Sequence, residues 1–173
     1  TGGALREGVL LDLFGRFHHH DQRDATVAQF MRRYHVDAAQ AARVESLALA
    51  LFDQVAVHLT QDVESARRLL SWAARLHEVG ITIAHAGYHK HSAYILGNAD
   101  MPGFSKTDQA RLSRLARTHR GGLVKAVKEQ AIEEDSWELI AILRLAVLLC
   151  RNRRDPDQSA LRYQREGSAM RLI

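Results

Sequence analysis

Hydrophobic residues recur along most of the chain at spacings of three and four, which is the pattern of amphipathic α-helices. Asp37 and Asp62 each precede such a pattern, and aspartate is a good N-cap residue. The inner face of the first predicted helix carries Val44, Leu47, Ala48, Leu51, Phe52 and Val55. That of the second carries Ala66, Leu69, Leu70, Ala73 and Leu76. Both helices therefore have predicted starts and a predicted buried side.

The same spacing predicts helices on both sides of this pair. Four of them cover 5–17, a restart near 92–96, 123–131 and 137–151. Another begins at Asp24, and another begins at a capping box formed by Ser105 and Asp108. The last helix would be capped by Asp135 or Ser136, and the inner residues after Asp24 would be Val27, Phe30, Met31 and Tyr34. Gly80 is expected as a C-terminal cap, and Gly121-Gly122 as a helix stop. The pattern predicts an all-α fold of about eight helices in one domain, residues 1–156.

The end of the chain differs from the rest. Residues 157–173 show no helical period, so we predict a tail there that includes the start of an extended segment. The longest apolar stretch, Leu139–Cys150, is interrupted by Arg144 and is too short to span a bilayer, so no transmembrane segment is expected. The chain begins within a helix-like pattern, which suggests a piece of a longer protein.

Composition indicates a reducing environment and an anionic partner. Cys150 is the single cysteine, which rules out an internal disulfide and favours a cytoplasmic location. Peripheral contact with a membrane surface stays open, because the net charge is +4.

A run of basic residues occupies 105–128, where Asp108 is the only acid. It contains Lys106, Arg111, Arg114, Arg117, Arg120, Lys125 and Lys128. Guanidinium groups bind phosphates in a bidentate manner, so a phosphate-binding stripe is one interpretation. A solvated helix face is the other. No aromatic residues alternate with these charges, so we expect no nucleic acid as a partner.

Histidines gather in a short part of the chain. His77, His85, His89 and His91 fall within fifteen residues, and Glu78 follows the first of them. Imidazole can bind a metal, and imidazolium can bind an anion. A buried histidine bonded to a backbone carbonyl is the structural alternative.

Three motifs together resemble the exopolyphosphatase / guanosine pentaphosphate phosphohydrolase (Ppx/GppA) family. They are Leu69–Gly80 (LLSWAARLHEVG), Ile83–His85 (IAH) and Tyr88–Leu96 (YHKHSAYIL). Shorter similar stretches lie at Ala4–Leu10, Arg33–Asp37, Met101–Phe104 and Leu143–Leu149. The resemblance runs in order from residue 4 to about residue 155.

This resemblance implies an HD-domain-like helical bundle that follows an N-terminal actin-like domain in the same protein. The missing domain would hold the catalytic residues and Mg²⁺, so we expect no catalytic residue in this chain. The parent enzyme would release terminal phosphate from inorganic polyphosphate, and a guanosine pentaphosphate phosphohydrolase is the alternative. We also expect a homodimer. A purely structural or dimerisation module is a third possibility.

The resemblance also locates a degenerate HD metal site. The His-Asp pair of HD domains corresponds to His77 and Glu78 in this chain. The other two ligand positions correspond to Gln40 and Val147, which carry an amide and a hydrocarbon. We therefore expect no metal in this region. A free-standing metal-dependent phosphohydrolase is the least favoured alternative.

The predicted polyphosphate-binding surface combines the basic run with the histidines. Its residues are Lys90, His85, His89, His91, Arg111, Arg114, Arg117, Arg120, Lys125 and Lys128. Contacts to a polyanion would make binding strongly dependent on salt.

Overall fold

The structure is a computed structural model that describes residues 22–58, 62–123, 136–157, 161–166 and 169–173. A helix covers 22–33 and is followed by α2 (Ala38–Val55), η1 (Ala56–His58), α3 (Val63–Leu76) and η2 (Val79–Thr82). Then come α4 (Tyr88–Asn98), α5 (Lys106–Thr118), α7 (Ser136–Leu149) and the strands β1 (Tyr163–Glu166) and β2 (Ala169–Leu172). The predicted all-α class is confirmed, with six α-helices in the described ranges rather than about eight.

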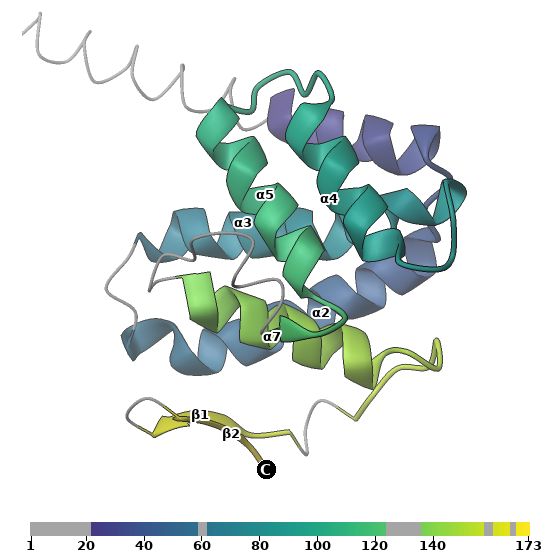
Figure 1. The fold of residues 1–173 in the computed structure, drawn as a ribbon. Helices are drawn as coiled ribbons and strands as arrows, with labels where there is room; N and C mark the ends of the chain where they lie inside the picture. The colour runs from purple at the N-terminus through teal and green to yellow at the C-terminus, as the bar shows by residue number, and fades with distance from the viewer. Residues whose placement is uncertain (1–21, 59–61, 124–135, 158–160, 167–168) are drawn as a thin grey trace, which may run out of the picture.

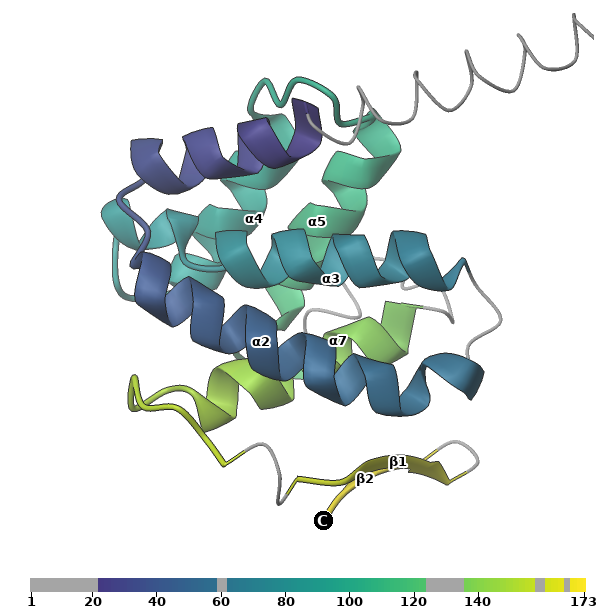
Figure 2. The same ribbon diagram turned by 180° about the vertical axis from the view of Figure 1, so that it is seen from behind.

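The helices form two layers. Helices α4 and α5 lie side by side and cross over a second layer that contains α2, α3 and α7 (Figures 1 and 2). The hydrophobic core lies between these layers. It contains residues from every described α-helix, including Phe30, Leu51, Leu70, Leu112 and Leu143.

Three predicted helix starts are confirmed. Asp37 accepts a hydrogen bond from the Gln40 amide at 3.0 Å, and Asp62 caps α3 in the same way. Ser105 and Asp108 form a reciprocal capping box at the start of α5. Each cap satisfies backbone donors that have no partner inside the helix.

The predicted role of Asp24 as an N-cap is wrong. The helix already includes residues 22 and 23, so Asp24 lies within it. The Asp24 carboxylate instead accepts a hydrogen bond from the Trp72 indole at 2.8 Å and lies 3.8 Å from Arg75. It therefore connects the first described helix to α3.

The predicted role of Gly80 as a helix cap is also wrong, because α3 ends at Leu76. Gly80 lies within η2, and a Cβ at this position would overlap the backbone of Ser92 and Tyr88. The Gly80 amide also donates to Ser92 Oγ at 2.9 Å. Close approach of α4, rather than helix termination, thus requires glycine here.

The end of the chain forms an antiparallel pair of strands below α2 and α7 (Figure 2). Tyr163 pairs with Leu172, and the Tyr163 side chain is buried against the core. The Tyr163 amide donates to Gln54 Oε1 of α2 at 2.9 Å. The tail is thus extended, and it packs on the helical layers.

Two predicted helices, 5–17 and 123–131, lie in or mostly in residues outside the described ranges. Among the helices that the structure does describe, none has both the length and the apolar character needed to cross a membrane.

Candidate functional site

A pocket of about 1000 Å³ opens where the two layers meet at the ends of α3, α5 and α7. Its walls come from five separate parts of the chain. They comprise Gln40, Glu78, Ile81, His85, Tyr88, His119, Arg120, Gly121, Arg144, Leu145, Val147, Leu148, Arg151, Asn152 and Arg153. Four of these residues are arginines, and Glu78 is the single carboxylate among them. The pocket is therefore strongly cationic.

Arg144 projects from α7 toward the end of α5. Its Nη1 donates to the Thr118 carbonyl, and its Nη2 donates to the Gly121 carbonyl at 3.0 Å. Both partners are neutral, so they orient the guanidinium without cancelling its charge. Partial burial lowers the pKa of Arg144. An arginine guanidinium nevertheless stays charged in proteins.

Arg120 and Gly121 follow the end of α5. The Arg120 guanidinium lies 5.3 Å from the centre of the Tyr88 ring, in a cation–π contact. Gly121 has a φ of 81°, a left-handed conformation that favours glycine, and the chain turns there. This turn brings the Gly121 carbonyl to Arg144 and leaves Arg120 on the wall of the pocket.

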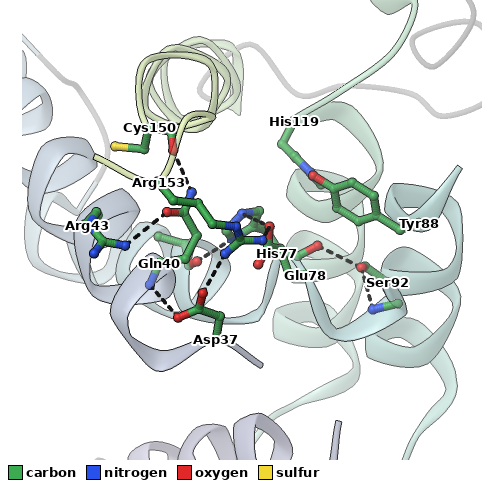
Figure 3. A network of polar contacts seen from close by, with 12 residues as sticks. Asp37, Gln40, Arg43, His77, Glu78, Tyr88, Ser92, His119, Cys150 and Arg153 are labelled. Atoms are coloured by element: carbon green, nitrogen blue, oxygen red, sulfur yellow. Dashed lines mark hydrogen bonds and ion pairs between the residues drawn. The ribbon is translucent and has the colours of Figure 1, made fainter. Parts of the chain in front are cut away.

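Arg153 connects three helix ends. Its Nη1 lies 2.7 Å from Asp37 Oδ2, and its Nη2 lies 3.3 Å from Glu78 Oε1. Figure 3 shows the guanidinium between the two carboxylates. The backbone amide of Gln40 is the main cause of the lowered pKa of Asp37, and the charge of Arg153 lowers it further. The N-terminus of α2, the end of α3 and the turn after α7 therefore meet at Arg153.

Gln40 forms the floor of the same corner. It is almost fully buried, and its Nε2 donates to the Cys150 carbonyl at 2.9 Å. Its Oε1 receives only a long contact, 3.5 Å, from Arg43. The amide oxygen of Gln40 is thus a weakly used acceptor at the edge of the pocket.

The four positions that correspond to HD ligands lie close together. Gln40, Glu78 and Val147 line the pocket, and His77 lies behind Glu78 with its Nε2 3.9 Å from Glu78 Oε1. The donor set does not fit a divalent metal: Val147 has no donor atom, and the nearest cation to Glu78 is Arg153. Within the described ranges, no group of three or more His, Cys, Asp or Glu side chains is placed to hold a metal ion.

Three histidines and Tyr88 form a cluster, of which Tyr88 and His119 line the pocket. The rings of His77 and His119 are 5.2 Å apart, and His89 lies 6.3 Å from His119. The Nδ1 atoms of His77 and His119 donate to the carbonyls of Ala74 and Ala116, at 2.6 and 2.7 Å. A carbonyl can only accept, so Nδ1 carries the proton in both rings.

Burial is the main cause of the lowered pKa of His77, and it lowers the pKa of His119 still further. Both rings are therefore neutral, and each Nε2 is an acceptor. Tyr88 Oη donates to His119 Nε2 at 3.2 Å. His77 Nε2 is buried and has no hydrogen-bond partner among the described residues. This arrangement agrees with the alternative of buried histidines bonded to the backbone.

The structure separates the ten residues that the sequence predicts for polyphosphate binding. His85 and Arg120 line the pocket, and His89 packs behind it against Gly121. Five others lie on α4 or α5 and line no wall of this pocket: Lys90, His91, Arg111, Arg114 and Arg117. Lys125 and Lys128 are outside the described residues. Ligand binding by any of the ten remains a prediction.

Three of the four pocket arginines are absent from the predicted set: Arg144, Arg151 and Arg153. Arg144 interrupts the most apolar stretch of the chain, and a charge within a buried helix is a usable signal for function. Arg153 gives no such signal, because an arginine after a helix is common. Only the tertiary contact with Glu78 distinguishes Arg153.

Comparison with known proteins assigns the class. The family described as "Ppx/GppA phosphatase, domain III" matches residues 22–172, and the chain belongs to this family. The resemblance found in the sequence is therefore confirmed. The match extends through the strand pair at the end of the chain.

Three of the similar proteins have the name guanosine-5'-triphosphate,3'-diphosphate pyrophosphatase. That of Pseudoalteromonas translucida is 42% identical over 157 residues, which cover 90% of this chain and 32% of that protein. That of Aeromonas hydrophila is 37% identical over 156 residues, covering 88% and 32%. That of Vibrio vulnificus is 32% identical over 173 residues, covering 99% and 35%. The chain thus spans about a third of the length of these relatives.

Proposed function

We propose that this chain is the C-terminal helical region of a guanosine pentaphosphate phosphohydrolase and that its pocket holds phosphate groups of the substrate. The observation that carries the proposal is the pocket with four arginines and one carboxylate. The names of the relatives support guanosine pentaphosphate over inorganic polyphosphate. In this proposal a preceding catalytic domain, with Mg²⁺, would hydrolyse the terminal 5′-phosphate.

The arginines are suited to phosphate because their charge is poorly compensated. Arg144 donates to two carbonyls, Arg120 lies over an aromatic ring, and Arg151 has no side-chain partner among the described residues. A phosphate would gain charge-assisted hydrogen bonds without displacing a carboxylate from these three groups. A bidentate fork also fits phosphate oxygens better than a lysine ammonium does.

The apolar residues of the same pocket support a nucleotide. They are Ile81, Leu145, Val147 and Leu148, and Leu148 is 55% exposed. A purine offers an apolar face that can cover such residues. Inorganic polyphosphate has no apolar part, so it would leave these residues in water. The mixed lining therefore favours a nucleoside polyphosphate.

The proposal can be tested by titration calorimetry with guanosine 5′-triphosphate 3′-diphosphate at 50 and 200 mM salt. We expect saturable binding that weakens as salt rises. Replacing Arg120 and Arg151 by glutamine should weaken binding by about tenfold or more. The double variant Arg67→Gln/Arg68→Gln, on the far surface of α3, removes the same charge and should change little. Equal weakening by both double variants, or no binding at low salt, would contradict the proposal.

A further inference from the structure

We propose that Glu78, Arg153 and Gln40 form a guanine-reading corner, which binds the base edge while the remaining arginines bind phosphates. This inference rests on the proposed function and names the part of the substrate that the corner recognises. A pocket built only for phosphates would not carry a carboxylate, yet Glu78 lines this one and is only 11% exposed.

The corner offers hydrogen-bond acceptors that a phosphate cannot use. Glu78 Oε1 pairs with Arg153, and Oε2 has no partner among the described residues. Gln40 Oε1 has one long contact because its Nε2 is committed to the Cys150 carbonyl. Phosphate oxygens only accept, so they would leave both acceptors unsatisfied and would be repelled by the Glu78 charge.

The same corner offers a donor beside these acceptors. The Nη2 of Arg153 lies 3.3 Å from Glu78 Oε1, so the guanidinium and the carboxylate are adjacent. Arg153 is held in place by Asp37 and is 47% exposed, so part of its fork faces solvent. Arginine is a common partner of guanine O6 and N7.

Guanine is complementary to this arrangement. Its Watson–Crick edge carries the acceptor O6 beside the donors N1–H and N2–H₂. Arg153 would donate to O6, and Glu78 Oε2 and Gln40 Oε1 would accept from N1–H and N2–H₂. Adenine provides only its N6 amino group as a donor on this edge, so it would leave one acceptor unpaired.

The apolar residues lie within the same pocket. Val147 and Leu148 of α7 line the pocket with Gln40 and Arg153, so a base at the corner can rest its face on hydrocarbon. The phosphates would then extend toward Arg144 and Arg151. One nucleotide would thus contact both the apolar residues and the arginines of the pocket.

The test compares three probes on this chain by calorimetry or fluorescence competition. They are guanosine 5′-diphosphate 3′-diphosphate, its adenosine counterpart and tripolyphosphate. We expect the guanosine probe to bind about tenfold or more tightly than the adenosine probe. Glu78→Gln should reduce this preference to about threefold or less, because the amide replaces one acceptor by a donor. An inosine probe, which lacks the 2-amino group, should fall between the two.

Controls separate loss of base recognition from loss of folding. Tripolyphosphate should bind Glu78→Gln at least as tightly as the parent, because a negative charge has left the pocket. Glu64→Gln on α3 removes the same charge elsewhere and should keep the guanosine preference. Equal binding of the guanosine and adenosine probes would overturn the corner while phosphate binding stands. Failure of all three probes at low salt would overturn the proposed function itself.

Discussion

Arginines on two faces of this molecule have different surroundings. On the exposed side of α3, Arg67 pairs with Asp53 at 3.1 Å, and Arg68 pairs with Glu64 at 3.0 Å. In the pocket, Arg144 contacts only carbonyls, and Arg151 has no side-chain partner among the described residues. The first face is neutralised locally, and the second keeps its positive charge.

This difference indicates which arginines are available to an anion. An exposed ion pair contributes little to stability and already satisfies its charge. A guanidinium oriented by neutral carbonyls keeps its charge and has a fixed direction, as a binding group requires. A count of basic residues along the sequence cannot distinguish the two cases.

The largest loss of stability is expected at Gly80, where the backbone of α4 approaches η2 closely. Gly80→Ala would place a methyl group against the backbone of Ser92 and Tyr88, which has no flexible end to move. We expect the free energy of unfolding to fall by about 3 kcal/mol or more, measured by urea denaturation. Gly122→Ala is the control, because nothing lies within 4 Å of its added Cβ. Equal stability of the two variants would show that α4 approaches η2 less closely than described.

The next largest loss of stability is expected at Arg144, whose guanidinium donates to two backbone carbonyls. Arg144→Gln removes the charged donor to the Thr118 and Gly121 carbonyls. Hydrogen bonds from charged groups contribute about 1.5–3 kcal/mol, so we expect a loss of unfolding free energy in that range. Guanosine 5′-diphosphate 3′-diphosphate should also bind at least about tenfold more weakly. Stability that falls while affinity stays constant would make Arg144 a structural residue only.

The buried histidines predict a pH dependence of stability. Burial lowers the pKa of His77 and His119 in the folded state. In the unfolded chain both side chains have the ordinary histidine pKa of about 6.5. The unfolded state therefore binds more protons below this pH, and stability falls as pH falls. The limiting slope is about 1.4 kcal/mol per pH unit for each histidine.

Urea denaturation between pH 7.5 and 5.0 would measure this slope. His119→Gln should make it shallower, because one buried titrating group is lost. A slope that is the same in both proteins would contradict the assignment of neutral buried rings.

The smallest losses of stability and affinity are expected on the surface of α3, where Arg67 and Arg68 pair with carboxylates. Arg67→Ala breaks the pair with Asp53 on the surface of α3. Exposed pairs contribute about 0–1 kcal/mol, so the midpoint of urea unfolding should shift only slightly. Affinity for the guanosine probe should stay within about twofold of the parent. A marked loss of affinity would remove the distinction between the two faces.

Local features of the fold could be predicted from the sequence. Asp37, Asp62 and the pair Ser105 and Asp108 cap helices through contacts within three residues, so sequence spacing determines them. The buried faces of α2 and α3 follow from helical periodicity for the same reason. The prediction for Gly80 is wrong because its constraint comes from a tertiary contact with α4.

The candidate site was harder to predict. Residues repeated every three positions step back by about 60° around a helix, so Arg111, Arg114, Arg117 and Arg120 spread over about half a turn. They cannot all face one groove, and only Arg120 lines the pocket. The resemblance was more informative, since it named Gln40, Glu78 and Val147, which the structure brings to one pocket.

The central claim is that the pocket arginines, and not the paired surface arginines, bind the phosphates. Nε–Hε spectra of ¹⁵N-labelled protein, at 19.5 kDa, report all arginines in one sample. On addition of guanosine 5′-diphosphate 3′-diphosphate, we expect shifts for Arg120, Arg144, Arg151 and Arg153 and none for Arg67 or Arg68. Shifts centred on Arg111, Arg114 and Arg117, or shared equally by both faces, would contradict the account.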